Sequence, residues 1–223
     1  MYRALLCILS TTVVALVNQA AAYDPVDAIE ATYADLADFR AEFTQQTIVE
    51  ALGKTVANRG TLAVRKPGLL RMEFAGQPQR QYISDGKQLW IYSPGDNQYQ
   101  VMPLGGASLP REALTFLNGF GELRRHFIVE PYAPPKKERG HIYLGLRPRG
   151  SAGYRLLTCD FEARGPMRHL LVALTIYGAT GNQTHYRFSN FSINSGLSPD
   201  LFRFVPPDGA RKVRIAEPSR RGK

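Results

Sequence analysis

The chain has 223 residues, of which 44% are hydrophobic and 21% are charged. That length gives one domain with a sizeable core and is too short to indicate two. Lys and Arg number 28 against 19 Asp and Glu, for a formal net charge of +9. This excess favours anionic partners without choosing among lipid headgroups, acidic proteins and nucleic acid.

The first 22 residues have the pattern of a cleaved signal peptide. Arg3 precedes the apolar run Ala4–Val17, and three alanines end at Ala22. The run is shorter than the ~20 apolar residues that span a bilayer, and small residues before Tyr23 indicate a cleavage site. We therefore predict an exported, soluble protein; the alternative is an uncleaved anchor.

Two cysteines occur in the chain, Cys7 and Cys159. Cys7 lies early in the apolar run and not after small residues at its end, so it is a poor site for acylation. Cys159 would then be the single cysteine of the mature chain, without a partner for an internal disulfide. Its apolar neighbours predict a buried thiol on a strand rather than a nucleophile.

An amphipathic helix is predicted at the start of the mature chain. Asp24 and Pro25 have the residue types of an N-cap and a first helical position. Apolar residues then recur at a spacing of three and four, and acidic residues mark the opposite side. The apolar stripe is Val26, Ile29, Tyr33 and Leu36, and the acidic side is Asp27, Glu30, Asp35 and Asp38.

Most of the remaining chain is predicted to form strands. Two long strands, Phe39–Val49 and Val56–Val64, are joined by a turn at Gly53. A meander of four short strands follows, with turn residues such as Asp85-Gly86 between them. These strands are Leu69–Ala75, Gln79–Ser84, Gln88–Ser93 and Gln98–Met102.

A short helix is predicted midway, at Pro110–Leu117, with Ala113, Leu114 and Leu117 on one face. It ends at Asn118-Gly119, a typical helix stop. Six further strand-like runs follow: Phe127–Val129, His141–Leu146, Tyr154–Phe161, His169–Tyr177, Thr184–Ile193 and Leu201–Val205. The pattern predicts a mainly β (α+β) fold with about eleven or twelve antiparallel strands.

Catalytic and metal-binding patterns are not found in the sequence. The four histidines, His126, His141, His169 and His185, lie at least 15 positions apart, which predicts surface or strand-end residues rather than metal ligands. The chain has neither a Gly-X-Ser-X-Gly elbow nor a phosphate-binding glycine loop. Basic residues are not regularly interleaved with aromatic residues, as nucleic-acid binding would require. We expect neither an enzyme nor a cofactor, metal or nucleic-acid partner.

The order of three segments resembles the LolA family of periplasmic lipoprotein carriers. The segments are Val64–Phe74, Ser84–Tyr92 with Gln100-Val101, and Phe202–Gly209, which resembles the closing strand and proline-glycine turn of that family. With the first helix included, the resemblance covers essentially the whole mature chain. It implies an incomplete antiparallel β-barrel with helices forming a lid over an apolar cavity.

The resemblance also implies a function and partners. The protein would bind the acyl chains of a lipoprotein, take this cargo from a lipoprotein-release ABC transporter of the inner membrane, and deliver it to an outer-membrane acceptor, acting as a monomer. An alternative is a lipid- or lipoprotein-sensing module of the same fold that regulates a membrane partner. A third possibility, the membrane-anchored acceptor itself, fits poorly because Cys7 is misplaced.

Candidate site residues follow from the resemblance and from strand periodicity. Lys66 stands where the family commonly has an arginine that holds the lid through its backbone, and Arg65 could share this latch. Lysine keeps the charge but lacks the fork of donors. Leu70, Met72 and Phe74 share a strand face by period two, and we expect them to line the cavity. The other predicted cavity residues are Trp90, Ile29, Tyr33 and Leu36, and the lid residues are Ala113, Leu114 and Leu117.

Three regions are thus expected along the chain. Residues 1–22 form the signal peptide, 23–210 a single half-barrel domain, and 211–223 a basic C-terminal tail. The tail is rich in Arg and Lys beside proline and glycine, which favours a solvated segment. The alternative is a basic patch that binds an anionic partner.

Overall fold

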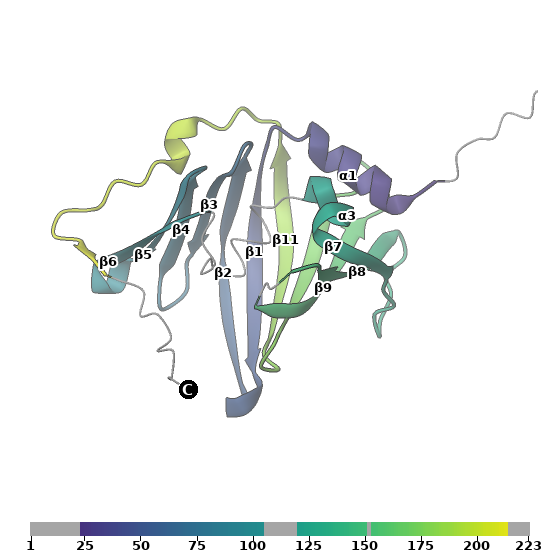
Figure 1. Ribbon diagram of the computed structural model, residues 1–223, viewed down its shortest axis with the longest axis horizontal. Coiled ribbons are helices and arrows are strands. Elements are labelled where there is room, and N and C mark those ends of the chain that lie inside the picture. Colours follow the sequence, from purple (N-terminus) through teal and green to yellow (C-terminus); the bar gives the residue numbers. More distant parts are fainter. Residues whose placement is uncertain (1–22, 105–119, 151–152, 214–223) are drawn as a thin grey trace, which may run out of the picture.

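A curved β-sheet dominates the part of the chain that the computed structural model describes, residues 23–104, 120–150 and 153–213 (Figure 1). Its strands are β1 (Asp38–Val49), β2 (Lys54–Arg65), β3 (Leu69–Phe74), β4 (Arg80–Asp85), β5 (Gln88–Ser93), β6 (Gln98–Pro103), β7 (Phe127–Pro131), β8 (His141–Pro148), β9 (Tyr154–Glu162), β10 (Leu171–Gly178), β11 (Gln183–Ile193) and β12 (Arg211–Lys212).

The strands form one sheet in the order β12-β6-β5-β4-β3-β2-β1-β11-β10-β9-β8-β7. All neighbours are antiparallel except β12, which runs parallel to β6. Among the described residues β6 and β7 do not pair, so the curved sheet remains open between them. The fold is therefore an incomplete β-barrel of twelve described strands, which confirms the predicted fold class.

The described helices are few and short. They are α1 (Pro25–Asp35), α3 (Leu123–His126) and the 3-10 turns η1 (Glu50–Leu52), η2 (Pro94–Asp96), η3 (Phe120–Glu122) and η4 (Pro199–Phe202). The predicted cap of α1 is confirmed, because the Val26 N–H donates to Asp24 Oδ1 over 2.8 Å and Pro25 begins the helix. No helix in the described ranges is long and apolar enough to cross a membrane.

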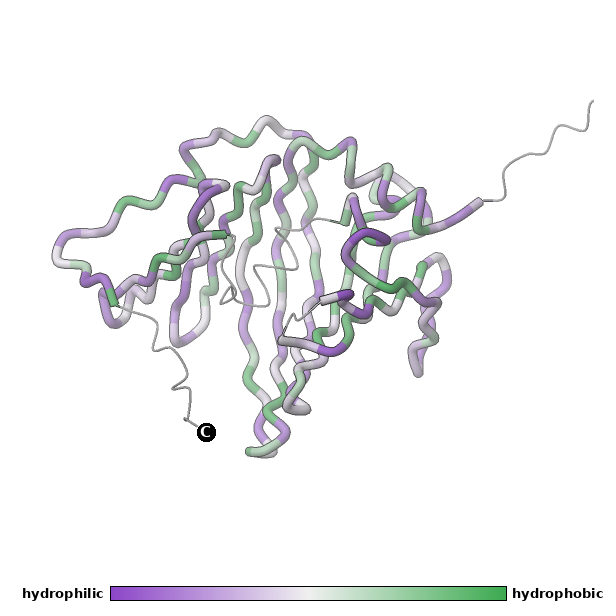
Figure 2. The backbone as a smooth tube through the Cα atoms, viewed as in Figure 1, coloured by the Kyte–Doolittle hydropathy of each residue, from purple (hydrophilic) through white to green (hydrophobic). Residues whose placement is uncertain are grey.

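The main core lies between the concave face of the sheet and the helices α1 and α3. Side chains alternate along the strands, with apolar residues on the concave side, and Figure 2 shows this alternation as changing colour along the central strands. On β3, Leu70, Met72 and Phe74 are buried while Arg71 and Glu73 lie between them on the other face. Cys159 is a buried free thiol on β9, as predicted, and burial raises its pKa.

One glycine on β2 permits the tight packing at the centre of this core. A Cβ at Gly60 would lie 1.9 Å from the carbonyl oxygen of Glu73 and 2.6 Å from the ring of Phe43. Any larger residue would push β3 or the Phe43 ring away. Gly60 therefore sets the close approach of β2 and β3 at this point.

The C-terminal strap, residues 197–210, crosses the outer face of the sheet (Figure 1, yellow). The segment Leu201–Val205, expected to be a strand, is instead the end of η4 followed by irregular chain. Ser198 caps η4 through the Asp200 N–H at 3.3 Å, and Pro199 starts the turn. The prediction was wrong because these residues favour a tight turn, and Pro206-Pro207 next to them have no N–H to donate to a sheet.

A second, smaller apolar cluster lies beneath the strap. Phe202 is 1% exposed and η4 packs against β3 and β4. Phe204 contacts the rings of Trp90, Tyr92 and Tyr99, with centroid distances of 6.1, 5.7 and 5.5 Å. The strap thus covers apolar side chains of the outer face that would otherwise be open to water.

Some predicted regions lie outside the described residues. These are the signal peptide at 1–22, the lid residues Ala113, Leu114 and Leu117, and most of the basic tail. At the start of that tail, Arg211 and Lys212 form β12 beside Gln98 and Tyr99 of β6.

Candidate functional site: a cavity beneath the first helix

Helix α1 lies across the concave face at one end of the strands (Figure 1). Its predicted apolar stripe is buried, with Ile29 0%, Tyr33 6% and Leu36 5% exposed. The Tyr33 ring packs edge-on against Phe39 of β1, with centroids 6.5 Å apart, and at a tilt of 54° against Phe120 of η3, with centroids 5.1 Å apart. The Leu171 N–H donates to the Tyr33 hydroxyl over 2.9 Å. The helix is therefore seated on the sheet by apolar contacts and by one buried hydrogen bond.

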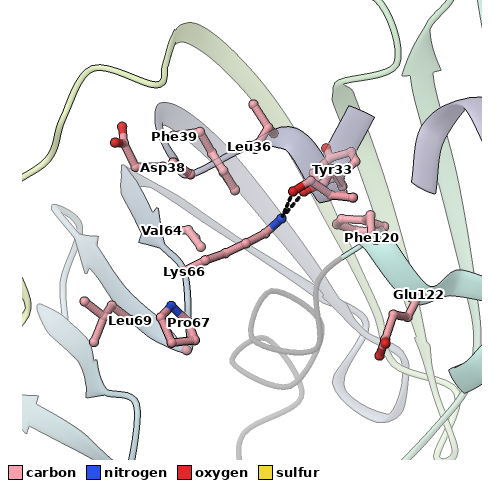
Figure 3. Close-up of a pocket in the computed structure, with 14 residues that line it drawn as sticks. Tyr33, Leu36, Asp38, Phe39, Val64, Lys66, Pro67, Leu69, Phe120 and Glu122 are labelled. Carbon is pink, nitrogen blue, oxygen red and sulfur yellow. Dashed lines mark hydrogen bonds between the residues drawn. The ribbon is translucent and has the colours of Figure 1, made fainter. Parts of the chain in front are cut away.

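A cavity of about 550 Å³ opens between α1, η3 and the ends of β1, β2 and β3. Figure 3 shows its walls, which are mostly apolar. The lining residues are Tyr33, Ala34, Leu36, Ala37, Asp38, Phe39, Val64, Lys66, Pro67, Gly68, Leu69, Phe120, Gly121 and Glu122. An apolar space of this size with a few polar groups at its edge is a typical ligand site.

Lys66 crosses the cavity and holds the end of α1 (Figure 3). Its Nζ donates to the backbone carbonyl of Tyr33 and, over 3.1 Å, to that of Ala34. These carbonyls belong to the last turn of α1, where backbone oxygens lack helical partners and a positive charge is favourable. Burial lowers the pKa of Lys66, against the opposing effect of Asp35. A single lysine thus bridges the sheet and the helix.

Arg65 points to a different partner. Its guanidinium donates to the backbone carbonyl of Leu197, at the start of the strap. Arg71 donates to the carbonyl of Leu201 over 3.1 Å in the same way. The two candidate latch residues therefore bind different segments: Lys66 binds the end of α1, and Arg65 binds the start of the strap.

Asp38, the first residue of β1, binds the backbone of residues 195–197, where the chain enters the strap, and this corrects an expectation. The helical period placed Asp38 on the solvent side, but the helix ends at Asp35 and Asp38 begins β1 with 5% exposure. Its carboxylate accepts from the N–H groups of Ser195 (2.9 Å), Gly196 (3.0 Å) and Leu197 (3.3 Å). Burial alone would raise the pKa of Asp38, but these hydrogen bonds outweigh it and hold the pKa below its usual value.

Replacing Asp38 with asparagine is expected to lower the free energy of unfolding by about 1 to 2 kcal/mol at pH 7, because the amide loses charge-assisted hydrogen bonds. A carboxyl group whose folded-state pKa is lowered contributes stability above its unfolded value, near 4, and loses it as the pH falls through the folded value. The difference between wild type and variant should therefore be constant above about pH 5 and shrink below about pH 4. Urea unfolding of wild type and Asp38→Asn at several pH values from 3 to 7 measures this difference in stability, and Asp208→Asn, at an exposed position, is the control. A stability difference that stays the same at every pH would show that the Asp38 carboxylate does not make these stabilising hydrogen bonds.

The predicted site residues fall into three groups. Tyr33, Leu36 and Lys66 line the cavity. Ile29, Leu70, Met72 and Phe74 lie in the adjoining apolar core, outside the lining. Trp90 lies elsewhere: it follows the core residue Leu89 on β5, so its side chain points to the outer face, against Phe204.

Several residues of the lining were not predicted from the sequence, above all Phe39, Val64 and Phe120. Phe39 and Val64 are partners across β1 and β2, and both alternate by period two with the core residues Phe43 and Leu62. That alternation could have identified them. Phe120 carries no such signal, because a 3-10 turn places it. Within the described ranges, no group of three or more His, Cys, Asp or Glu side chains is arranged to hold a metal ion.

Residues 34–205 match the family described as outer membrane lipoprotein carrier protein LolA. The chain belongs to the LolA family. The match begins at the last turn of α1 and ends in the strap, so it includes every residue of the cavity lining except Tyr33, together with Lys66 and Asp38. The resemblance inferred from the sequence is confirmed.

Two relatives show how far the likeness to LolA family members extends. An outer-membrane lipoprotein carrier protein of Dechloromonas aromatica (strain RCB) is 28% identical over 207 residues, covering 92% of this chain and 95% of that protein. Another, of Hahella chejuensis (strain KCTC 2396), is 28% identical over 214 residues, covering 95% and 99%. The crystal structure of an uncharacterized conserved protein from Thermus thermophilus aligns with a TM-score of 0.54 at 15% identity, over 86% of this chain and 97% of that one. This last likeness concerns the fold alone.

Proposed function

We propose that the protein is a periplasmic carrier that binds the acyl chains of lipoproteins in the cavity beneath α1. The proposal rests on the apolar cavity of about 550 Å³ that α1 covers. Lys66 holds α1 there by donating hydrogen bonds to backbone carbonyls of the helix. The names of the relatives supply the class of cargo. The cargo would come from a lipoprotein-release ABC transporter of the inner membrane and pass to an outer-membrane acceptor.

The energetics of acyl transfer explain why such a site needs a closing helix. Burial of each CH₂ group gives ~0.8 kcal/mol, so a lipoprotein does not leave a membrane without an apolar surface to receive it. A carrier must also release its cargo. Closure of α1 buries Tyr33, Leu36 and Phe120 of the carrier itself, and this offsets part of the binding free energy. Closure of the empty carrier therefore favours release of cargo, whereas bound cargo favours the open position of the helix.

The function is tested by identifying what the protein holds in the cell. Protein purified without detergent from the periplasm of its own host is extracted with organic solvent, and the extract and the intact complex are analysed by mass spectrometry. We expect a lipoprotein bearing acylated cysteine, and a mature amino terminus at Tyr23, with residues 1–22 removed and 23–210 acting as one carrier domain. Finding only free phospholipid, or a chain that still begins at Met1, would contradict these proposals.

Replacing Val64 with tryptophan tests the cavity itself. Val64 lines the cavity without being fully buried, so the indole can enter the empty space. It should displace at least one methylene of the acyl chain, worth ~0.8 kcal/mol, and weaken binding about fourfold. The measurement is the affinity for a fluorescent diacylated lipopeptide. The matched control is Val56→Trp, at a valine that is 44% exposed near the β1–β2 turn and outside the cavity. If both variants weaken binding equally, the acyl chain does not bind in this cavity.

A further inference from the structure

Three aromatic side chains line both the cavity beneath α1 and a second, much smaller cavity next to it. The small cavity has a volume of about 10 Å³, and the side chains around it are aliphatic or aromatic. Five of its lining residues do not line the large cavity: Leu62, Leu170, Leu171, Phe188 and Phe191. Tyr33, Phe39 and Phe120 line both, so their rings lie between the two spaces. We call these three rings the aromatic wall, and Figure 3 shows them.

Helix α1 carries one ring of the aromatic wall, and the other two belong to β1 and η3. Phe39 lies on β1, which pairs with β2 on one side and with β11 on the other. Phe120 packs against Phe161 of β9 as well as against Tyr33, with centroids 5.7 and 5.1 Å away. Both rings therefore have contacts that do not depend on α1. If α1 leaves the sheet, Tyr33 is the ring that leaves the wall.

Two hydrogen-bond donors hold Tyr33 in the wall. Lys66 donates to its backbone carbonyl, and the Leu171 N–H donates to its hydroxyl over 2.9 Å. Leu171 is 3% exposed, so loss of the hydroxyl would leave a buried N–H unpaired, which is unfavourable. The Tyr33 side chain thus resists displacement. A ligand that displaces it must supply the free energy from its own burial.

Only an apolar group suits the small cavity. A water molecule needs about two to four polar partners, which aliphatic and aromatic side chains do not supply, whereas methylene groups gain free energy by leaving water. The small cavity adjoins the large one at the aromatic wall, so such a group would be the far end of a chain already bound in the large cavity. With a volume of about 10 Å³, the small cavity has no room for that end while Tyr33 is in place.

We propose that the Tyr33 side chain sets the length of the acyl chain that can bind while α1 stays closed. A short chain fits the large cavity and leaves the aromatic wall intact. A longer chain reaches the wall, and it extends into the space beside Leu170 and Leu171 only when Tyr33 leaves with α1. Long acyl chains therefore hold α1 open, and short ones do not. This inference rests on the proposed function, because it concerns the same acyl chain.

A series of fluorescent lipopeptides tests the proposal on the mature protein. The lipopeptides are identical except that a single acyl chain grows by one methylene group at a time, and they are used below the concentration at which they form micelles. In wild type, each added methylene should raise the affinity about fourfold until the chain reaches the wall. The methylene that first requires α1 to open should give no such gain. At the same length, the α1 amides of the complex should lose protection from hydrogen exchange.

Two variants of Tyr33 separate the ring from the hydroxyl. Tyr33→Ala removes the ring and joins the two cavities, so the break in affinity and the loss of α1 protection should both move to longer chains. Tyr33→Phe keeps the ring, so its break should stay at the wild-type length. The matched control is Phe202→Ala, which removes another buried ring, outside both cavities, and should leave the break where wild type has it.

The outcomes distinguish this inference from the function on which it rests. Protection of α1 that does not depend on chain length, or a break that Tyr33→Ala leaves in place, would overturn the role of Tyr33 while acyl binding stands. Absence of binding at every chain length would overturn the proposed function and this inference together. If Tyr33→Ala does not fold, wild type and Tyr33→Phe decide. A break at different lengths in these two proteins, or an α1 that opens with the shortest chain that binds, overturns the inference.

Discussion

Replacing Phe202 with alanine is expected to lower the free energy of unfolding by about 3 to 4 kcal/mol. Phe202 is 1% exposed and belongs to the cluster beneath the strap rather than to the main core. Its removal would leave a cavity between η4 and strands β3 and β4, and it would loosen the strap. Urea unfolding monitored by the fluorescence of Trp90, the single tryptophan, measures the loss and reports directly on the cluster.

Val205→Ala provides the matched control for that experiment. Val205 is only three residues further along the strap but is 68% exposed, so its truncation should change stability by less than about 0.5 kcal/mol. Acyl binding per folded molecule should survive in both variants, because neither side chain lines the cavity. A loss below about 1 kcal/mol for Phe202→Ala would mean that the strap is not anchored at this ring.

Local sequence patterns were sufficient to predict the sheet and the first helix. The apolar spacing from Val26 to Leu36 and the cap at Asp24 are properties of neighbouring residues, and α1 has them as predicted. The same holds for turns: Gly86 has a φ of +88° between β4 and β5, where Asp85-Gly86 predicted a hairpin. Strand boundaries agree within a few residues because the breaks depend on local turn chemistry.

The strap was predicted wrongly although its turn has local signals in Ser198 and Pro199. Leu201–Val205 has the apolar content of a strand, and the resemblance also indicated a closing strand. Where the strap lies depends on the surface that it covers, the outer-face side chains of β3 to β6, which are distant in sequence. The misplacement of Trp90 has the same origin. A period of two tells which residues share a face, but it does not tell which face turns inward when both carry apolar residues.

The site was predicted in part and for mixed reasons. Tyr33 and Leu36 followed from helix periodicity, while Lys66 followed from the resemblance alone. The role of Asp38 and the seating of Tyr33 depend on hydrogen bonds to residues more than 130 positions away in the sequence, namely Ser195 and Leu171. No local pattern contains such pairs. They could only be recognised once the sheet had brought the two halves of the chain together.

Replacing Lys66 with alanine is expected to tighten acyl binding about tenfold. The variant loses two charge-assisted hydrogen bonds to the last turn of α1, and for a partly exposed lysine we assign them about 1.4 kcal/mol in total. When only the open form binds cargo, the apparent affinity equals the intrinsic affinity multiplied by the fraction of molecules that are open. Weakening the closed form raises that fraction, so the variant should bind a fluorescent diacylated lipopeptide more tightly and release it to acceptor vesicles more slowly.

Two further lysine variants separate a latch from a direct contact with cargo. Lys54→Ala, at an exposed position at the start of β2, should bind like wild type. Lys66→Arg keeps the cation and adds donors, so closure should be equal or stronger and binding equal or weaker. If Lys66→Ala instead weakens binding, the ammonium group touches the cargo and does not act as a latch. Hydrogen exchange checks the latch directly: loss of Lys66 should expose the amides of the C-terminal turn of α1, because its ammonium group holds the carbonyls of Tyr33 and Ala34 there.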